Sequence, residues 1–260
     1  MTIRPISLAF LSALFLVGCA QIPPDAGQNP EDPYERFNRH VHAFNTSLDR
    51  VVLKPVTEGY RWAVPETARE GVSNVVDNIG EPGNAVNNVL QGKVTQGIES
   101  VFRFMVNTTF GIGGIFDVAS WIGMEKTNED FGQTLGVWGM NDGPYLVLPV
   151  LGPSGGRDVF RWPVSAATNP LTYGLWHEEW YWGVGVGAVT AVDARSRLID
   201  AGFEDLRTNG VDEYVALRSA YRQMRKNQVA DGELSSDEAL ENLTPLSFDE
   251  DDESAPEAEK

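Results

Sequence analysis

The sequence predicts a mainly α fold: one domain of many short-to-medium helices joined by glycine- and proline-rich segments. Apolar residues recur at helical spacing in several segments. The 26 glycines and 15 prolines interrupt these segments and mark the joints between them. The apolar run from Tyr145 to Leu151 is the single strand candidate, so we expect at most one or two short strands.

The first expected helix opens at Asp32-Pro33-Tyr34-Glu35. Asp32 suits the N-cap, Pro33 suits the first helical position, and Glu35 completes a capping box. Pro55 is expected to end or kink this helix. The helix carries an apolar face at helical spacing, made by Phe37, Val41, Phe44, Leu48 and Val52.

Further helices follow between turn signals. Pro65 is expected to start a helix, and Gly80-Glu81-Pro82-Gly83 to end it in a turn. A short helical piece follows from Asn84 to Leu90, and two more helices are expected after Gly183–Ala188 and around Tyr214–Met224. A helix is also expected directly after Asn84–Leu90, with an apolar face made by Val94, Ile98, Val101, Phe102 and Met105.

The segment from Phe131 to Asp158 has seven glycines and three prolines in 28 residues. Four of these glycines recur every three or four residues, too many for a stable helix when each costs about 1 kcal/mol against alanine. We expect a packed, irregular element whose backbone turns tightly or lies very close to another group.

Charge is unevenly distributed along the chain. Of the formal net charge of −17, a share of −11 lies between Asp231 and Lys260. That acidic segment is poor in aromatic residues, so we expect a disordered tail over 231–260. The acidic balance argues against nucleic acid as a partner.

The N-terminus resembles the signal of a bacterial lipoprotein. Arg4 precedes an apolar run from Ile6 to Val17, too short for the roughly 20 residues of a membrane span. Leu16-Val17-Gly18-Cys19 resembles a lipobox, which implies a signal peptide over 1–18 and Cys19 as the lipid anchor. An ordinary signal peptide with an incidental cysteine is the alternative.

The residues after Cys19 extend this prediction. Ala20 stands where an inner-membrane retention signal would place aspartate, which implies the periplasmic side of a Gram-negative outer membrane. Residues 19–31 are rich in proline and polar residues, and we expect a tether before the folded part over 32–230.

Enzyme signals are weak. Gly152–Gly156 fits G-x-S-x-G with Ser154 as nucleophile and His177 downstream, but that hydrolase fold needs several parallel strands. A lipid hydrolase using Ser154 is therefore kept only as an alternative. Gly183–Ala188 loosely fits G-x-G-x-x-A, and close packing of a helix start explains it better. With three histidines and one cysteine, we predict no metal site and no cofactor.

Several stretches lack charge without reaching spanning length. Each has 13 or 14 residues and is broken by glycine or proline, so none can span a membrane. We expect them to be core segments or parts that lie within one leaflet. The stretches are Phe104–Phe116, Gly143–Gly156, Pro163–Trp176 and Trp180–Val192. The aromatic cluster Trp176, Trp180, Tyr181 and Trp182 fits an interfacial belt or core packing equally well.

Four segments resemble the MlaA (VacJ) family of outer-membrane lipoproteins, from about Asp32 through the Tyr214–Met224 helix. They are DPYERFNRHVHAFNTSLDRVVLKPV, VNNVLQGK, RFMVNTTFGIGGIFDVAS and FGQTLGVWGMNDGPYLVLPVLGPSGGRD. Two features depart from the family pattern: Phe160-Arg161-Trp162, where a glycine is expected, and the long acidic tail.

This resemblance implies a non-enzymatic protein in retrograde phospholipid transport, which removes mislocalised phospholipid from the outer leaflet. The implied fold is a helical ring in the inner leaflet of the outer membrane, with an amphipathic channel. The implied partners are phospholipids, trimeric porins of the OmpC/OmpF type and an MlaC-type periplasmic carrier that serves an inner-membrane ABC transporter. A lipoprotein that merely braces porins is a further alternative.

Two residue sets are carried over as expected sites. A channel wall is expected to include Asn38, Asn45, Gly136, Gly139, Asn141 and Gly143. A basic group is expected to meet the acidic carrier or lipid headgroups, unless it is only a solvated face: Arg218, Arg222, Arg225 and Lys226.

Overall fold

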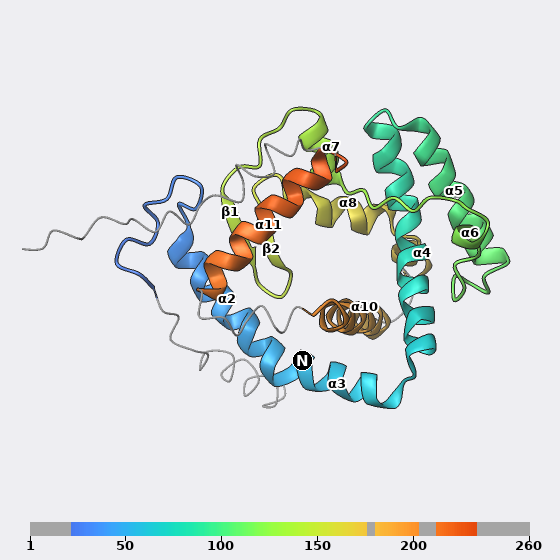
Figure 1. Ribbon diagram of the computed structural model, residues 1–260, viewed down its shortest axis with the longest axis horizontal. Coiled ribbons are helices and arrows are strands. Elements are labelled where there is room, and N and C mark those ends of the chain that lie inside the picture. Colours follow the sequence, from blue (N-terminus) through green and yellow to red (C-terminus); the bar gives the residue numbers. More distant parts are fainter. Residues whose placement is uncertain (1–21, 176–179, 203–211, 233–260) are drawn as a thin grey trace, which may run out of the picture.

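Helices outline a ring in the computed structural model, which describes residues 22–175, 180–202 and 212–232 (Figure 1). Two joined helices, α2 and α3, form the lower side in this view, α4 the right side, and α8, α7 and α11 the upper side. Helix α10 lies inside the ring and is seen almost along its axis. The expected mainly α, ring-like body is confirmed.

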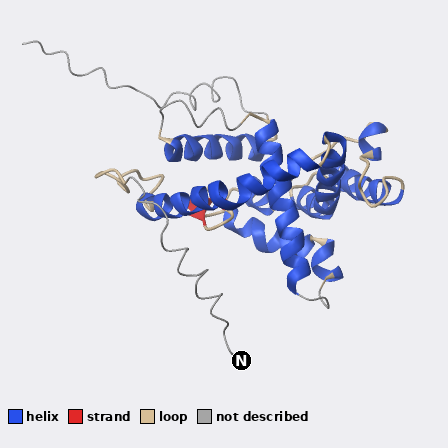
Figure 2. Cartoon of the chain, turned by 90° about the horizontal axis from the view of Figure 1, so that it is seen from below, coloured by secondary structure: helices blue, strands red, loops and turns tan. Residues whose placement is uncertain are grey.

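Strand is confined to one small hairpin, while helices make up most of the described chain (Figure 2). The elements in order are α2 (Glu35–Leu48), η2 (Asp49–Leu53), α3 (Lys54–Ala63), α4 (Glu66–Leu90), α5 (Val94–Thr109), α6 (Val118–Trp121), α7 (Phe131–Val137), β1 (Tyr145–Leu148), β2 (Gly152–Gly155), η3 (Asp158–Phe160), α8 (Arg161–Thr168), α9 (Pro170–Gly174), α10 (Trp180–Asp200) and α11 (Glu213–Val229).

The start of α2 differs from the predicted capping box. Its N-cap is Tyr34, and no side chain caps it. The Asp32 carboxylate instead accepts hydrogen bonds from Asn38, Tyr214 and Arg218. Glu35 accepts from Arg39 and from the Gly27 amide. Both carboxylates therefore bind other donors, Asp32 partly on α11 and Glu35 one turn further along α2, instead of the free amides at the helix end.

Helix α2 continues through η2 into α3 without a break in the helical backbone. The backbone is right-handed helical at Leu48, Asp49, Leu53 and Lys54, and the intervening η2 is a π-helical turn. Pro55 lies just beyond it and lacks an N–H donor, while its ring crowds the carbonyl four residues before. The wider turn relieves this clash, so Pro55 produces a π-turn rather than a helix end.

Helix α4 begins after Pro65 as predicted, but the turn expected at Gly80–Gly83 is wrong. The helix continues through Pro82 to Leu90, and Asn84–Leu90 are its last turns. Packing explains the difference: Glu81 is buried and forms a salt bridge to Arg103 of α5 at 2.9 Å. Tertiary contacts therefore override the local turn signal.

The glycine-rich segment contains a helix that was not expected. Asp130 caps α7 by accepting a hydrogen bond from the Gln133 amide at 2.9 Å. The predicted close approach is confirmed, because a Cβ at Gly132 would lie 2.5 Å from Asp158 Oδ1 and 2.7 Å from Arg225 Nη2. These glycines remain in the helix because neighbouring charged groups occupy the space of a side chain.

Strand β1 confirms the single strand candidate, although it ends at Leu148 rather than Leu151. It pairs antiparallel with β2, in the register Tyr145 opposite Gly155 and Leu148 opposite Gly152. Ser154 lies in β2, where the sequence predicts only a glycine-rich turn. The connecting turn places Val150 at φ 68°, in the left-handed region.

Two further predictions need correction. Residues 22–31 of the expected tether pack against the fold, since Tyr145 N donates to Glu31 O and Arg36 donates to Ala26 O. Gly183, Gly185 and Gly187 lie inside α10, and a Cβ at any of them would meet no described atom within 4 Å. The close helix packing predicted for them is not found among the described residues.

The interior is polar and the outer surface is apolar. On α5 the predicted apolar face is exposed, with Ile98 52% and Phe102 48% accessible, while Ser100 and Arg103 are 1% accessible. Phe37 of α2 is likewise 57% exposed beside the fully buried Asn38. No helix among the described residues is long and apolar enough to span a membrane. An apolar surface of this extent marks an interaction site.

A small hydrophobic core exists only where α2, the hairpin and α11 meet, within the described chain. It is made by Val41, Tyr145, Val147, Tyr214 and Tyr221, with Val215 packed against it. Tyr145 contacts the rings of both other tyrosines at 6.0 Å between centroids. This core fixes the hairpin beside α11.

Candidate functional site

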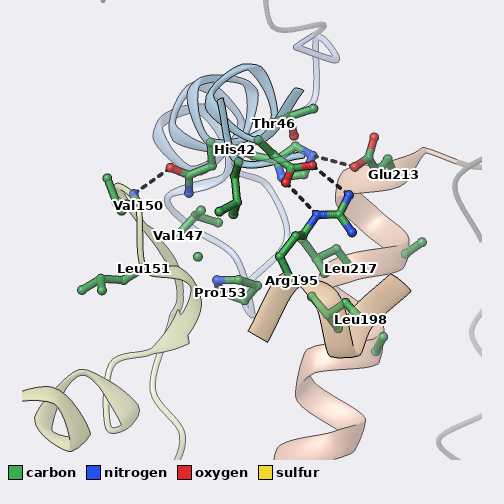
Figure 3. Close-up of a pocket in the computed structure, with 16 residues that line it drawn as sticks. His42, Thr46, Val147, Val150, Leu151, Pro153, Arg195, Leu198, Glu213 and Leu217 are labelled. Carbon is green, nitrogen blue, oxygen red and sulfur yellow. Dashed lines mark hydrogen bonds and ion pairs between the residues drawn. The ribbon is translucent and has the colours of Figure 1, made fainter. Parts of the chain in front are cut away.

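A pocket of about 310 Å³ lies between α2, η2, the hairpin, the end of α10 and α11 (Figure 3). Its volume is at the lower end of the range for small-molecule sites. The lining residues are His42, Asn45, Thr46, Asp49, Leu53, Val147, Val150, Leu151, Gly152, Pro153, Arg195, Leu198, Glu213, Ala216, Leu217 and Ala220.

One wall of this pocket carries charge. Arg195 of α10 forms a bidentate salt bridge to Asp49 of η2, with Nε–Oδ1 2.7 Å and Nη2–Oδ2 3.1 Å. The two side chains are 8% and 16% exposed. His42 Nε2 lies 3.9 Å from Glu213 Oε1, so a second pair joins α2 to α11 across the same wall.

The remaining wall is apolar, so the pocket is amphipathic. Leu198 and Leu217 reach it from α10 and α11, and Val147, Leu151 and Pro153 reach it from the hairpin (Figure 3). A ligand with a charged end and a hydrocarbon part matches such a lining.

Two asparagines of α2 hold the hairpin against the pocket. Asn38 is fully buried; it donates to Tyr145 O and accepts from Val147 N, both at 2.9 Å. Asn45 donates to Leu148 O at 2.9 Å and accepts from Val150 N at 2.8 Å. These amides take the place of strand partners along the edge of β1. The two residues therefore set the position of the pocket wall.

A largely buried ionic cluster, made by Asp130, Asp158, Tyr221 and Arg225, holds α11 to α7 and η3. The Arg225 guanidinium donates to Asp130 and Asp158 at 2.7 to 2.9 Å, and Tyr221 donates to Asp158 at 2.6 Å. Burial raises the pKa of Asp158, but hydrogen bonds from Arg225 and Tyr221 outweigh it and hold that pKa below its usual value. Burial and the Asp158 carboxylate both raise the pKa of Tyr221.

The predicted channel residues are scattered, and only Asn45 lines the pocket. Asn38 is bonded to the backbone of the hairpin and does not line the pocket. Gly136 packs against Arg157, since a Cβ at Gly136 would lie 2.8 Å from Arg157 Nη1. Asn141 is exposed, and Gly139 and Gly143 have φ 93° and 69° in the loop between α7 and β1. These glycines serve the turn and the packing of α7.

The four residues of the predicted basic group lie in three different environments. Arg225 is 2% exposed within its ionic cluster, so contact with a carrier or a headgroup is not available to it. Arg218 donates to the buried Asp32 carboxylate at 2.8 Å, and Arg222 pairs with Glu31. Lys226 is exposed. Sequence reasoning could not separate these roles, because the partners lie far away in the chain.

The hydrolase motif does not have the geometry of a nucleophile elbow. Ser154 is 0% exposed, in the second strand of the hairpin, and its Oγ lies 3.4 Å from Gly155 O. An elbow instead presents its serine at a sharp turn from a strand into a helix. His177 and Cys19 lie outside the described residues.

The charged residues of the pocket wall were not predicted. Asp49, Arg195, His42 and Glu213 come from four different elements. Tyr181 and Trp182 of the aromatic cluster are 52% and 53% exposed, which favours a surface belt over core packing for these two residues. No group of acidic, histidine or cysteine side chains in the described part of the chain could hold a metal ion.

Comparison with known proteins decides the family. The family model described as MlaA lipoprotein matches residues 30–228. The chain belongs to the MlaA family. The MlaA lipoprotein of Escherichia coli K12, named an intermembrane phospholipid transport system lipoprotein, is 36% identical over 249 residues. That alignment covers 92% of this chain and 93% of the relative.

Other MlaA-like proteins support the assignment. The Haemophilus influenzae protein of the same name is 34% identical, over 90% of this chain and 94% of its own length. An uncharacterised Rickettsia typhi protein is 40% identical over 200 residues, covering 76% and 78% of the two chains. A solved structure, reported as the structural basis for maintenance of bacterial outer membrane lipid asymmetry, matches with TM-score 0.66 and 34% identity. It covers 76% of this chain and 98% of its own.

Proposed function

We propose that this protein is an outer-membrane lipoprotein that removes mislocalised phospholipids from the outer leaflet and passes them towards the periplasm. The observation that carries the proposal is the amphipathic pocket beside a ring whose outer surface is apolar. Such a pocket offers a charged wall to a headgroup and an apolar wall to acyl chains. Two relatives of this protein are named intermembrane phospholipid transport system lipoproteins, and these names support the same function here.

The polar interior and the apolar outer surface support a position within one leaflet. The outward residues of α2 and α5 include Phe37, Ile98 and Phe102, each about half exposed. In lipid the backbone groups of these helices remain satisfied, and apolar side chains are the favoured surface. The described helices are too short or too polar to cross the bilayer.

The anchor and the domain limits complete the proposal. Residues 1–18 act as a signal peptide, and Cys19 carries the lipid that holds the protein at the periplasmic face of the outer membrane. Residues 19–31 then connect the anchor to the fold over 32–230, with residues 22–31 in contact with that fold, and 231–260 form an acidic tail. More than one acyl chain gives stable anchoring, which a single chain does not.

The partners are proposed from the family resemblance. The apolar ring associates with trimeric porins, and lipid leaves the pocket for an MlaC-type soluble carrier. Lys226 is exposed and Arg222 is partly exposed on α11, so these two remain the candidates for that contact among the four basic residues.

A pair of tryptophan substitutions on α11 tests the proposal. Ala220→Trp places an indole in the pocket, whereas Ser219→Trp adds the same bulk at the neighbouring exposed position, which does not line the pocket. Each variant is returned to a strain that lacks the gene, and outer-leaflet phospholipid and detergent sensitivity are measured. We expect Ser219→Trp to restore normal surface lipid and Ala220→Trp to fail at equal protein level.

Two results would contradict the proposal. If deletion leaves the surface phospholipid unchanged while the protein still co-purifies with a porin, the protein braces porins instead. If Ala220→Trp restores the lipid composition as fully as the wild type, phospholipid does not pass through this pocket.

A further inference from the structure

Arg161 carries a charge that the fold leaves unpaired. This residue begins α8, on the upper side of the ring, directly after η3 (Figure 1). Its Cζ lies 4.6 Å from the centroid of the Trp162 ring, so the guanidinium stacks on the indole. Within the described part of the chain, no hydrogen bond and no ion pair reaches this guanidinium. Its charge is therefore available to an anion from outside the chain.

The neighbouring ionic cluster does not use this charge in a direct contact. Its two carboxylates, Asp130 and Asp158, both accept hydrogen bonds from Arg225. Burial raises the pKa of Asp130, but the hydrogen bonds and charge of Arg225 outweigh it and lower that pKa. Arg161 adds to this lowering by its charge alone. The cluster thus lies near Arg161 but leaves its donors unbound.

Two donors at this stack are buried without an acceptor among the described residues: Arg161 Nε and Trp162 Nε1. Buried polar groups are nearly always hydrogen-bonded, and a bound ion is one explanation where the chain supplies no acceptor. The rest of the Arg161 side chain is partly exposed, so a ligand can reach its terminal nitrogens. A ligand that fits these donors carries negative charge and several acceptor oxygens.

We propose that Arg161 and Trp162 bind the phosphate of a phospholipid headgroup at a second site, outside the pocket. Neither residue lines the pocket. A guanidinium presents a planar fork of donors that matches phosphate oxygens. Stacking on Trp162 occupies a face of this fork and leaves its edge, where the donors lie, open to the phosphate.

The surface around the stack favours a lipid over a free phosphate ion. Phe160, directly before Arg161, is about half exposed. The exposed residues that follow on α8 include Pro163, Ala166 and Ala167, and no charged residue occurs from Pro163 to Trp176. Acyl chains can lie on this apolar surface while the phosphate binds Arg161. A tryptophan beside a cation also suits the interface between lipid and water.

The site is a property of this chain. Phe160-Arg161-Trp162 is the segment in which the sequence departs from the family pattern. The family resemblance therefore does not imply a phosphate site at this position, and the assignment rests on the stack and its unpaired donors.

The indole N–H of Trp162 provides the readout for a test. The full-length lipidated protein, with isotope-labelled indole nitrogens, is studied by NMR in neutral maltoside micelles, and Trp162→Phe assigns the signal. Three probes are titrated at constant ionic strength: dihexanoylphosphatidylcholine, dihexanoylglycerol and inorganic phosphate. We expect the signal to shift with the phospholipid and to stay in place with dihexanoylglycerol, which has the same acyl chains without phosphate. Inorganic phosphate should need about tenfold higher concentration, because it lacks apolar contacts.

Matched variants assign the binding to the stack, and the remaining tryptophan signals check that each variant is folded. Arg161→Gln should weaken phospholipid binding by about tenfold or more. Arg161→Lys keeps the charge but loses the fork, so it should recover only part of the binding. Arg50→Gln removes the same charge at an exposed position of η2 and should titrate as the wild type. Ala220→Trp should also titrate as the wild type, because it alters only the pocket.

Several outcomes would overturn the inference. If the phospholipid leaves the Trp162 signal in place, or if Arg161→Gln titrates as the wild type, this stack is not a phosphate site. An equal shift with dihexanoylglycerol would show that α8 binds acyl chains alone. If inorganic phosphate binds as tightly as the phospholipid, the ligand is the free ion and not a lipid. Failure of the pocket in the surface-lipid assay leaves these titrations unchanged, so the two proposals fail independently.

Discussion

Along α4 and α5 the interior is polar, whereas the junction of α2, the hairpin and α11 contains a hydrophobic core. The first region, the α4–α5 seam, buries Glu81, Arg103 and Asn107 together with four asparagines of α4. The second, the tyrosine junction, buries Tyr145, Tyr214 and Tyr221, and each of the last two donates its hydroxyl to a buried aspartate.

The proposed position within one leaflet accounts for this difference. The seam carries apolar side chains outward, and in lipid the burial of more apolar groups would bring little gain. Hydrogen bonds and ion pairs therefore hold the two helices together. The tyrosine junction lies beside the pocket, where apolar burial against water is favourable. One short chain thus uses two different principles of packing.

Arg103→Met should give the largest effect, about 3 to 5 kcal/mol of unfolding free energy, because it leaves buried charge unpaired. Arg103 donates to Glu81 at 2.9 Å and to both Asp117 oxygens. Denaturant unfolding in detergent, followed by circular dichroism, measures the loss. Lys126→Met is the control, because its pair with Asp77 is exposed and worth about 0 to 1 kcal/mol. Equal costs would show that the seam does not depend on its ion pair.

Tyr221→Phe should cost about 2 kcal/mol in the same assay, since its hydroxyl donates to the charged Asp158 at 2.6 Å. Tyr145→Phe, in the same core, should change stability by about 0.5 kcal/mol or less, because its buried hydroxyl has no hydrogen-bond partner among the described residues. A similar cost for the two variants would show that the junction is held by aromatic packing alone.

Asp117→Asn should reveal an acid-dependent part of the seam. Burial raises the pKa of Asp117, but hydrogen bonds from Ser120 and Asn107 and the charge of Arg103 outweigh it and lower that pKa to about 2. The ionised carboxylate therefore stabilises the folded state above pH 4 by on the order of 2 kcal/mol, and this is lost as pH falls towards 2. The stability difference between variant and wild type should shrink over that range. A constant difference from pH 6 to pH 2 would exclude this role.

Helical periodicity located most helices but not their inner faces. The stripe of Ile98 and Phe102 predicts a helix correctly, because amphipathic spacing is the same whether the apolar side faces a core or lipid. Asn84, Asn87 and Asn88 of α4 and the lone basic residue of α5, Arg103, were the signal that the other face is buried. The ring-like shape was predicted from the family resemblance and not from the spacing of apolar residues.

The pocket was beyond local sequence reasoning. Arg195 and Asp49 are 146 residues apart, and no local pattern links them. Asn45 was predicted near the channel, and it does line the pocket, where it holds the hairpin turn. The turn predicted at Gly80–Gly83 failed for the same reason, since the buried Glu81–Arg103 pair keeps α4 helical across Pro82.

The contact between Asp32 and α11 joins the first and last parts of the described chain. Asp32 accepts hydrogen bonds from Tyr214 and Arg218, which lie 182 and 186 residues later. This contact with α11 therefore forms only after α11 has been synthesised. A chain truncated before α11 would keep the Asp32 carboxylate without these two donors and the hairpin without its tyrosine neighbours.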